Sequence, residues 1–157
     1  MIYLWYLCTK NAKIMKKLLI LTICGLFIST ALFAQKSDKP FMGRFENEEY
    51  KIYLRINLHD NDVQVPGQEI YGDLPGFLGK QMNSFCWLIT SAKLKGKNKA
   101  SLQLINEYGS EDLEASLTLK GDSVLILKQE EGSVIKMPNK GKWQKIPSPL
   151  EFRRRGR

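Results

Sequence analysis

The sequence predicts an all-β protein, an antiparallel up-and-down (meander) barrel of about eight strands. Apolar and polar residues alternate along segments such as 52–58 and 113–120, and this period of two is typical of strands with one buried and one solvated face. Turn residues such as Gly121-Asp122 separate the segments at the spacing of about 8–12 residues that is typical of sandwiches and barrels. No amphipathic helix of useful length is predicted between them.

Further strands are expected between the turns, each paired with its neighbour in the sequence. The longest is 84–95, where Phe85, Cys86, Trp87 and Leu88 are apolar on both faces of the strand. Another part of the chain must therefore cover the outer face of this strand. The remaining expected strands are 100–106, 123–129, 133–137 and 142–146.

Residues 59–83 depart from this pattern. They contain two Pro-Gly pairs suited to type II turns, and a short strand is expected within them at 69–73. A long irregular segment in a small domain is usually either functional or disordered. The apolar side chains of Tyr71, Phe77 and Leu78 argue against disorder, so this segment is a candidate functional surface with these residues exposed.

Residues 15–34 are predicted to be a secretory signal peptide. Lys16 and Lys17 supply its positive start, an uncharged apolar run follows, and Ala34 is the small residue that a signal peptidase needs beside its cut. The apolar run is shorter than the roughly 20 residues of a membrane span, so cleavage is favoured over retention as an anchor. We expect a periplasmic or extracellular protein without a stable membrane span, and an upstream extension from a misassigned start at 1–14.

The formal net charge of +8 falls on the two ends of the chain. Half of it belongs to four lysines (10, 13, 16 and 17) that precede the predicted cleavage site, and the other half to the arginines of 153–157. This basic tail is expected to be either a solvated end or a contact for anionic envelope lipid or polysaccharide. Residues 35–152, the predicted single barrel domain, hold 16 basic and 16 acidic residues. A neutral body argues against a nucleic-acid partner.

The motif Phe41-Met42-Gly43-Arg44-Phe45 stands just before the first strong strand. It resembles the N-terminal F-x-G-x-W/F signature of lipocalins and other calycins. The resemblance implies a meander barrel with Phe45 as the plug at one end, in place of the commoner tryptophan. It also implies a cation–π contact between that ring and Arg153, Arg154 or Arg155. The helix that follows the barrel in lipocalins has no counterpart after Ile146, so we expect a lipocalin-like secreted domain.

No catalytic or metal site is expected. His59 is the only histidine, and Asp60 and Asp62 fit a strand-ending Asx turn better than a calcium loop, because the glycine and the distal glutamate of such a loop are missing. The acidic cluster at 46–49 is expected to be a solvated turn rather than a catalytic carboxylate pair. Removal of the leader leaves Cys86 as the only cysteine, predicted to be a buried core thiol.

Two functions stay open at this point. The first is binding of a small apolar or amphipathic ligand in the barrel or at its mouth, with Tyr71, Phe77, Leu78 and Trp87 as contacts. It predicts a cavity of at least ~300 Å³, whereas a filled interior would exclude a ligand held inside. The alternative is an envelope module that binds a protein, such as an enzyme inhibitor, through the loops of 59–83. We expect a monomer that is not an enzyme and uses no cofactor.

Overall fold

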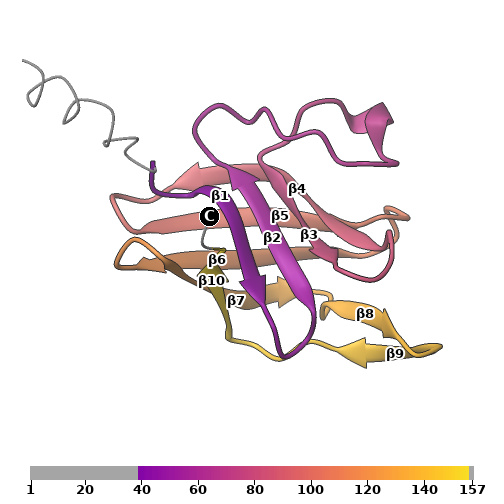
Figure 1. The fold of residues 1–157 in the computed structure, drawn as a ribbon. Coiled ribbons are helices and arrows are strands. Elements are labelled where there is room, and N and C mark those ends of the chain that lie inside the picture. Colours follow the sequence, from indigo (N-terminus) through magenta and orange to yellow (C-terminus); the bar gives the residue numbers. More distant parts are fainter. Residues whose placement is uncertain (1–38, 156–157) are drawn as a thin grey trace, which may run out of the picture. The chain divides into compact units, whose positions relative to one another are not determined.

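Alternating side chains and tight turns fold residues 39–155, the part of the chain that the computed structural model describes, into an antiparallel sheet. Eight strands close into a barrel. A separate hairpin, β8–β9, lies between β7 and β10 in the sequence but outside the barrel (Figure 1). The predicted all-β meander barrel is confirmed. The predicted signal peptide and residues 1–14 lie outside the described residues. The elements are β1 (Met42–Asn47), β2 (Ile52–Asn57), η2 (Glu69–Tyr71, a 3₁₀ helix), β3 (Gly76–Lys80), β4 (Cys86–Leu94), β5 (Lys99–Asn106), β6 (Asp112–Lys120), β7 (Val124–Gly132), β8 (Lys136–Asn139), β9 (Lys142–Lys145) and β10 (Leu150–Arg154).

Several local predictions need correction. β3 lies inside the segment predicted to be irregular, and η2 replaces the short strand predicted at 69–73. β8 and β9 pair with each other outside the barrel. The second partner of β7, besides β6, is therefore β10 and not β8, the next strand in the sequence. β10 includes Arg153 and Arg154, so the boundary predicted between the barrel and a basic tail at residue 152 is too early.

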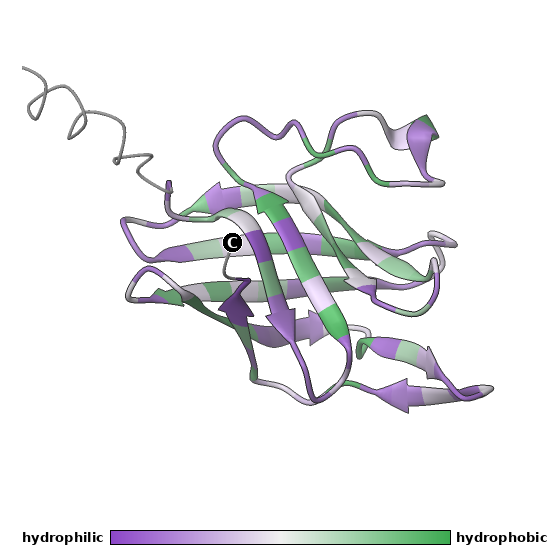
Figure 2. Ribbon diagram, in the orientation of Figure 1, coloured by the Kyte–Doolittle hydropathy of each residue, from purple (hydrophilic) through white to green (hydrophobic). Residues whose placement is uncertain are grey.

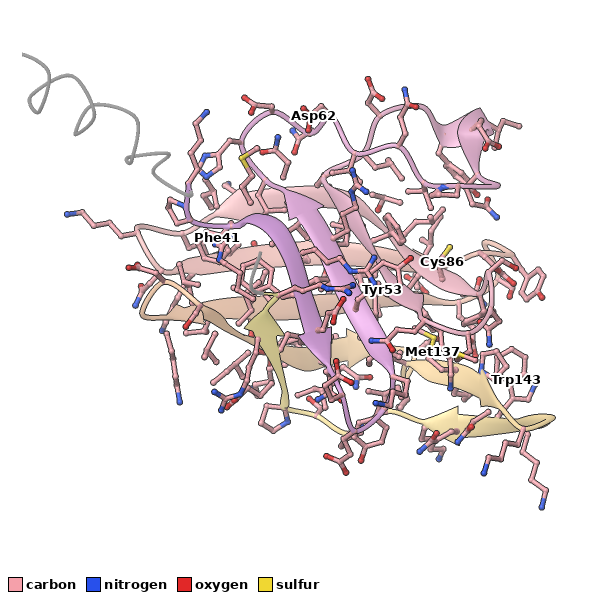
Figure 3. All side chains as sticks on the ribbon, viewed as in Figure 1. Phe41, Tyr53, Asp62, Cys86, Met137 and Trp143 are labelled. Carbon is pink, nitrogen blue, oxygen red and sulfur yellow. The ribbon has the colours of Figure 1, made fainter. Side chains whose placement is uncertain are left out.

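Apolar side chains from the inner face of every barrel strand fill the interior, and the alternation of hydropathy along the strands is visible in Figure 2. Phe41 and Leu58 close the end where β1 begins, joined by a hydrogen bond from the Leu58 N–H to the Phe41 carbonyl of 3.1 Å. Ile135, Met137 and Ile146, at the base of β8–β9, close the opposite end, here called the hairpin end. Figure 3 labels Phe41 and Met137, which lie toward opposite ends of the barrel.

The barrel closes where β1 meets β10, and Arg154 secures this seam. Its guanidinium lies 4.5 Å from the centre of the buried Phe45 ring. It also donates to the carbonyls of Met42, at 2.8 Å, and Asp122, at 3.1 Å. Gly43 makes room for it, because a Cβ on this residue, whose φ is +125°, would stand 2.8 Å from the arginine Nη1. The residues of the Phe41–Phe45 motif therefore serve closure of the sheet.

The outer face of β3 and β4 is covered by the segment 58–75, here called the β2–β3 segment. Val63 and Leu74 pair across it through two backbone hydrogen bonds of 3.0 Å. Together with Val65 they pack over Phe77 and Leu88, forming a second apolar cluster outside the barrel. This cluster explains how the first half of β4 can be apolar on both faces.

Replacement of Arg154 by alanine is expected to destabilise the protein by about 2 kcal/mol, because it removes a cation–π contact and hydrogen bonds to two carbonyls. Arg153→Ala is the control, since Arg153 pairs only with the exposed Glu151 at the surface and such pairs contribute less than about 1 kcal/mol. Chemical denaturation measures both. A double-mutant cycle with Phe45→Leu should give a coupling energy with Arg154→Ala; strict additivity would contradict a ring–guanidinium contact.

Candidate functional site

The four residues predicted to contact a ligand do not form one site, although Leu78 and Trp87 are paired neighbours on β3 and β4. Leu78 and Trp87 are fully buried in the barrel interior. Phe77 is buried on the opposite face of the sheet, in the outer cluster with its ring 5.6 Å from that of Tyr53. Tyr71 is exposed on η2. The expectation that Phe77 and Leu78 are exposed is therefore wrong, and these residues build the fold rather than one binding surface.

The polar residues near the end of β2 form a structural turn. The side-chain amide of Asn57 donates to Asp60 at 3.1 Å and to Asp62 at 2.7 Å, while its carbonyl oxygen accepts from the backbone N–H of His59 at 3.2 Å. Both carboxylates therefore already serve the turn. Across residues 39–155, no group of His, Cys, Asp and Glu side chains is arranged to hold a metal ion.

The acidic cluster at the end of β1 and in the turn after it is likewise engaged by arginines and a lysine. Glu46 accepts from Arg44 at 2.7 Å and from Arg155 at 3.1 Å, and Glu48 pairs with Lys51 at 2.7 Å. The Lys51 ammonium lowers the pKa of Glu48, first by hydrogen bonding and then by its charge. A carboxylate held in its ionised form by a cation is not suited to act as a general acid.

Three aromatic side chains converge at the hairpin end, where they line a cleft of about 560 Å³. The Phe85 ring centre lies 5.1 Å from that of Trp143, in an edge-to-face arrangement, and 6.2 Å from that of Tyr108. Phe85 is buried, whereas Tyr108 is 71% and Trp143 59% exposed. Phe85 thus forms the base of an aromatic cleft whose two sides are open to solvent; Trp143 is labelled in Figure 3.

Polar groups surround this aromatic cleft. Lys136 forms an ion pair of 3.0 Å with Glu111, whereas Lys145 has no ion pair within the described part of the chain. Hydrogen bonding with Glu107, and then the charge of that carboxylate, raises the pKa of Tyr108. The phenol therefore stays protonated at neutral pH, with its O–H engaged by Glu107. The cleft thus joins an apolar base to Lys145, which no carboxylate of residues 39–155 neutralises.

The β8–β9 hairpin, which supplies Trp143, is held by buried contacts. The Trp87 indole donates from inside the barrel to the Lys136 carbonyl at 3.3 Å. The side chain of Gln129 spans the base of the hairpin, donating to the Ile146 carbonyl at 3.1 Å and accepting from the Ile135 N–H at 2.8 Å. These contacts position one side of the cleft relative to the barrel.

Sequence reasoning did not select Tyr108 or Trp143, and assigned Phe85 to the core alone. They lie on the β5–β6 connection, on β9 and on the β3–β4 connection, respectively. One signal was present: Trp143 stands in Lys142-Trp143-Gln144-Lys145, a strand with no other apolar residue. A large aromatic in such a strand is poorly explained by core packing and suggests a surface role.

Comparison with known proteins found no relative of this chain. No protein-family model matches the chain, and no curated protein or solved structure matches it. The resemblance of the Phe41–Phe45 motif to lipocalins therefore stays a prediction. Within residues 39–155, no helix has the length and apolar character that crossing a membrane demands.

Cys86 lies on the outer face of the sheet beside a cavity of about 630 Å³. Burial, with a smaller contribution from the charge of Glu107, raises the pKa of its thiol to about 11. Only the thiolate is an effective nucleophile, so the native thiol is expected to be inert at neutral pH.

Alkylation of Cys86 by iodoacetamide at pH 8 is expected to be at least ~100-fold slower in the native protein than in guanidinium chloride, because burial both suppresses the thiolate and blocks the reagent. Peptide mass spectrometry after timed quenching measures the modification at this position. The denatured sample is the control, and equal rates in the two samples would contradict the assigned burial.

Proposed function

We propose that this protein binds a small amphipathic ligand at the mouth of the barrel, in the aromatic cleft of Phe85, Tyr108 and Trp143. The observation that carries the proposal is the exposure of Tyr108 and Trp143 on either side of a buried ring. Exposing two large aromatic side chains to water is unfavourable. Aromatic side chains that flank a concave surface are typical of small-molecule sites.

The chemistry of the cleft favours a ligand with a flat apolar body and an acidic group. Stacked or edge-to-face contacts with Tyr108 and Trp143 suit a ring or another flat apolar group. The ammonium of Lys145 lines the same cleft and would receive a carboxylate, sulfonate or phosphate. A volume of about 560 Å³ lies within the usual range for ligands of this size.

A site at the mouth is favoured over one inside the barrel. The inner faces of the strands pack into one continuous apolar core, and side chains close both ends. A ligand inside would have to displace Met137 or Phe41, each of which is buried. The cleft needs no such rearrangement, because it is already open to solvent.

A protein-binding function through residues 59–83 is the second candidate. It is supported by Ile70, which lies on η2 at the outside of the β2–β3 segment with 92% of its surface exposed. The two functions use different surfaces, since η2 is not part of the cleft lining. The variant Ile70→Asp should therefore abolish capture of an envelope protein and leave the cleft unaffected.

The fluorescent probe 1-anilinonaphthalene-8-sulfonate, which has flat rings and an acidic group, is expected to bind the protein saturably in the aromatic cleft. Trp143→Ala should weaken this binding about tenfold, since loss of one aromatic contact of about 1.4 kcal/mol changes a dissociation constant by that factor. Fluorescence titration measures the constants.

Leu94→Ala is the control for this experiment, because Leu94 is an exposed apolar residue at the end of β4, outside the cleft lining. Tyr71 is unsuitable, since its hydroxyl lies beside Gly109, next to Tyr108. The Leu94→Ala variant should bind the probe as the unmodified protein does. Equal affinity of Trp143→Ala and the unmodified protein, or a loss in Leu94→Ala alone, would rule out the cleft as the ligand site.

A further inference from the structure

The β8–β9 hairpin presents different residues to two separate cavities. Lys136 pairs with Lys145, and Trp143 lies two residues from Lys145 on the same face, toward the aromatic cleft. Gln144 and Asn139 belong to the alternate face, with the buried Met137. Gln144 and Asn139 line a second cavity of about 430 Å³, between the hairpin, the β1–β2 turn and the end of β3.

Lys80, the last residue of β3, lines this second cavity. Only 8% of its surface is exposed, although lysine is among the residues least often buried without a partner. Its ammonium makes no ion pair or hydrogen bond with residues 39–155, and its removal from water lowers its pKa. Every buried side-chain nitrogen and oxygen of the described residues has a hydrogen-bond partner. The ammonium of Lys80, which has none, therefore still reaches the solvent of the cavity while its aliphatic stem is packed.

The neighbours of Lys80 offer further hydrogen-bond donors. The side-chain carbonyl of Asn83 is used by the backbone N–H of Phe85, at 3.1 Å, so its NH₂ group remains available. Gln144 accepts from Asn139 at 2.7 Å, which likewise leaves its NH₂ group available. Lys80, Asn83 and Gln144 thus bring donors from three segments of the chain to one cavity.

The charge around the cavity is also positive. Lys51, Lys80 and Lys140 line it together with one carboxylate, that of Glu49. Lys51 is partly neutralised by Glu48, at 2.7 Å. Lys80 and Lys140 remain, opposed by Glu49 alone. Ammonium and amide donors gathered beside a net positive lining are typical of sites for carboxylate or phosphate groups.

We propose that the cavity beside Lys80 is an oxyanion-binding site, which takes a carboxylate or phosphate group with Lys80 as its principal ligand and with Asn83 and Gln144 as amide donors. The volume is larger than either ion alone, so the group belongs to a larger molecule. This site is independent of the aromatic cleft, because it lies on the other face of the hairpin.

Titration of the purified full chain with inorganic phosphate and, separately, with acetate tests the site. The ionic strength is held constant with sodium chloride, and backbone amide shifts are followed by NMR. At least one anion is expected to bind saturably, with the largest shifts at Lys80, Asn83 and Gln144. Stronger binding of phosphate would identify a phosphorylated ligand, and stronger binding of acetate a carboxylic acid. Absence of saturable binding by both anions would overturn the proposal.

Lys80→Gln should weaken this binding at least tenfold, and the matched control Lys97→Gln, in the exposed β4–β5 turn, should leave it unchanged. Equal binding by the unmodified protein and Lys80→Gln would overturn the proposal. If Lys80→Gln does not fold, the amide shifts of the unmodified protein on anion titration test the site instead. Shifts centred away from Lys80 would count against the proposal.

Thermal unfolding tests whether Lys80 has a merely structural role. Binding of the fluorescent sulfonate tests whether this site is distinct from the aromatic cleft. Lys80→Met keeps the packed stem and removes the ammonium, so it should abolish anion binding and change the midpoint of thermal unfolding little. A clearly lowered midpoint would indicate a structural role and count against the proposal. Lys80→Gln should bind the fluorescent sulfonate normally, and Trp143→Ala should bind phosphate or acetate normally. Loss of only one activity in each variant keeps the two sites distinguishable.

Discussion

Closing a sheet into a barrel requires its first and last strands to pair, and here β1 and β10 share only two directly paired positions, Phe45–Arg154 and Glu46–Arg153. Side chains reinforce this short seam. Asn47 donates to the Glu151 carbonyl at 2.9 Å, and the Arg155 guanidinium reaches Glu46 at 3.1 Å. Arg154 contributes most, since it covers an aromatic ring and binds two carbonyls at once. Without the seam, β1 and β10 would present unpaired edges.

The seam also sets the position of both candidate sites. The β8–β9 hairpin lies outside the barrel and precedes β10, which pairs with β1. This hairpin places Met137 at the hairpin end of the barrel interior. The same hairpin carries Trp143 on one face and Gln144 on the other. One short structural element thus closes the barrel and borders both the aromatic cleft and the cavity beside Lys80.

Strands with one solvated face could be predicted from the sequence, because alternation reports that arrangement directly. β3 could not, since Gly76, Phe77, Leu78, Gly79 and Lys80 are all buried and glycine weakens any strand pattern. β10 was missed for a different reason. Leu150 and Phe152 do alternate with charged residues, but the arginines that follow resemble a solvated tail until the partner strand is known.

The candidate sites were less predictable than the fold. Phe85 and Tyr108 stand on two separate connections and Trp143 on β9, and only the fold of the barrel brings these three segments to one end. Lys80 has no sequence signal at all, because its place in a cavity depends on segments far away in the sequence, the β8–β9 hairpin among them. Individual residue types indicate what chemistry is possible, whereas proximity across the barrel depends on topology.

The seam has a consequence for when the protein can fold. Met42 and Arg154, which it joins, are 112 positions apart in the sequence. Contacts of such long range form slowly, and β1 has no closing partner until β10 has been synthesised. A chain still emerging from the ribosome therefore cannot complete the barrel. If the predicted leader directs export, this delay would keep the chain unfolded for the period in which a translocation channel accepts it.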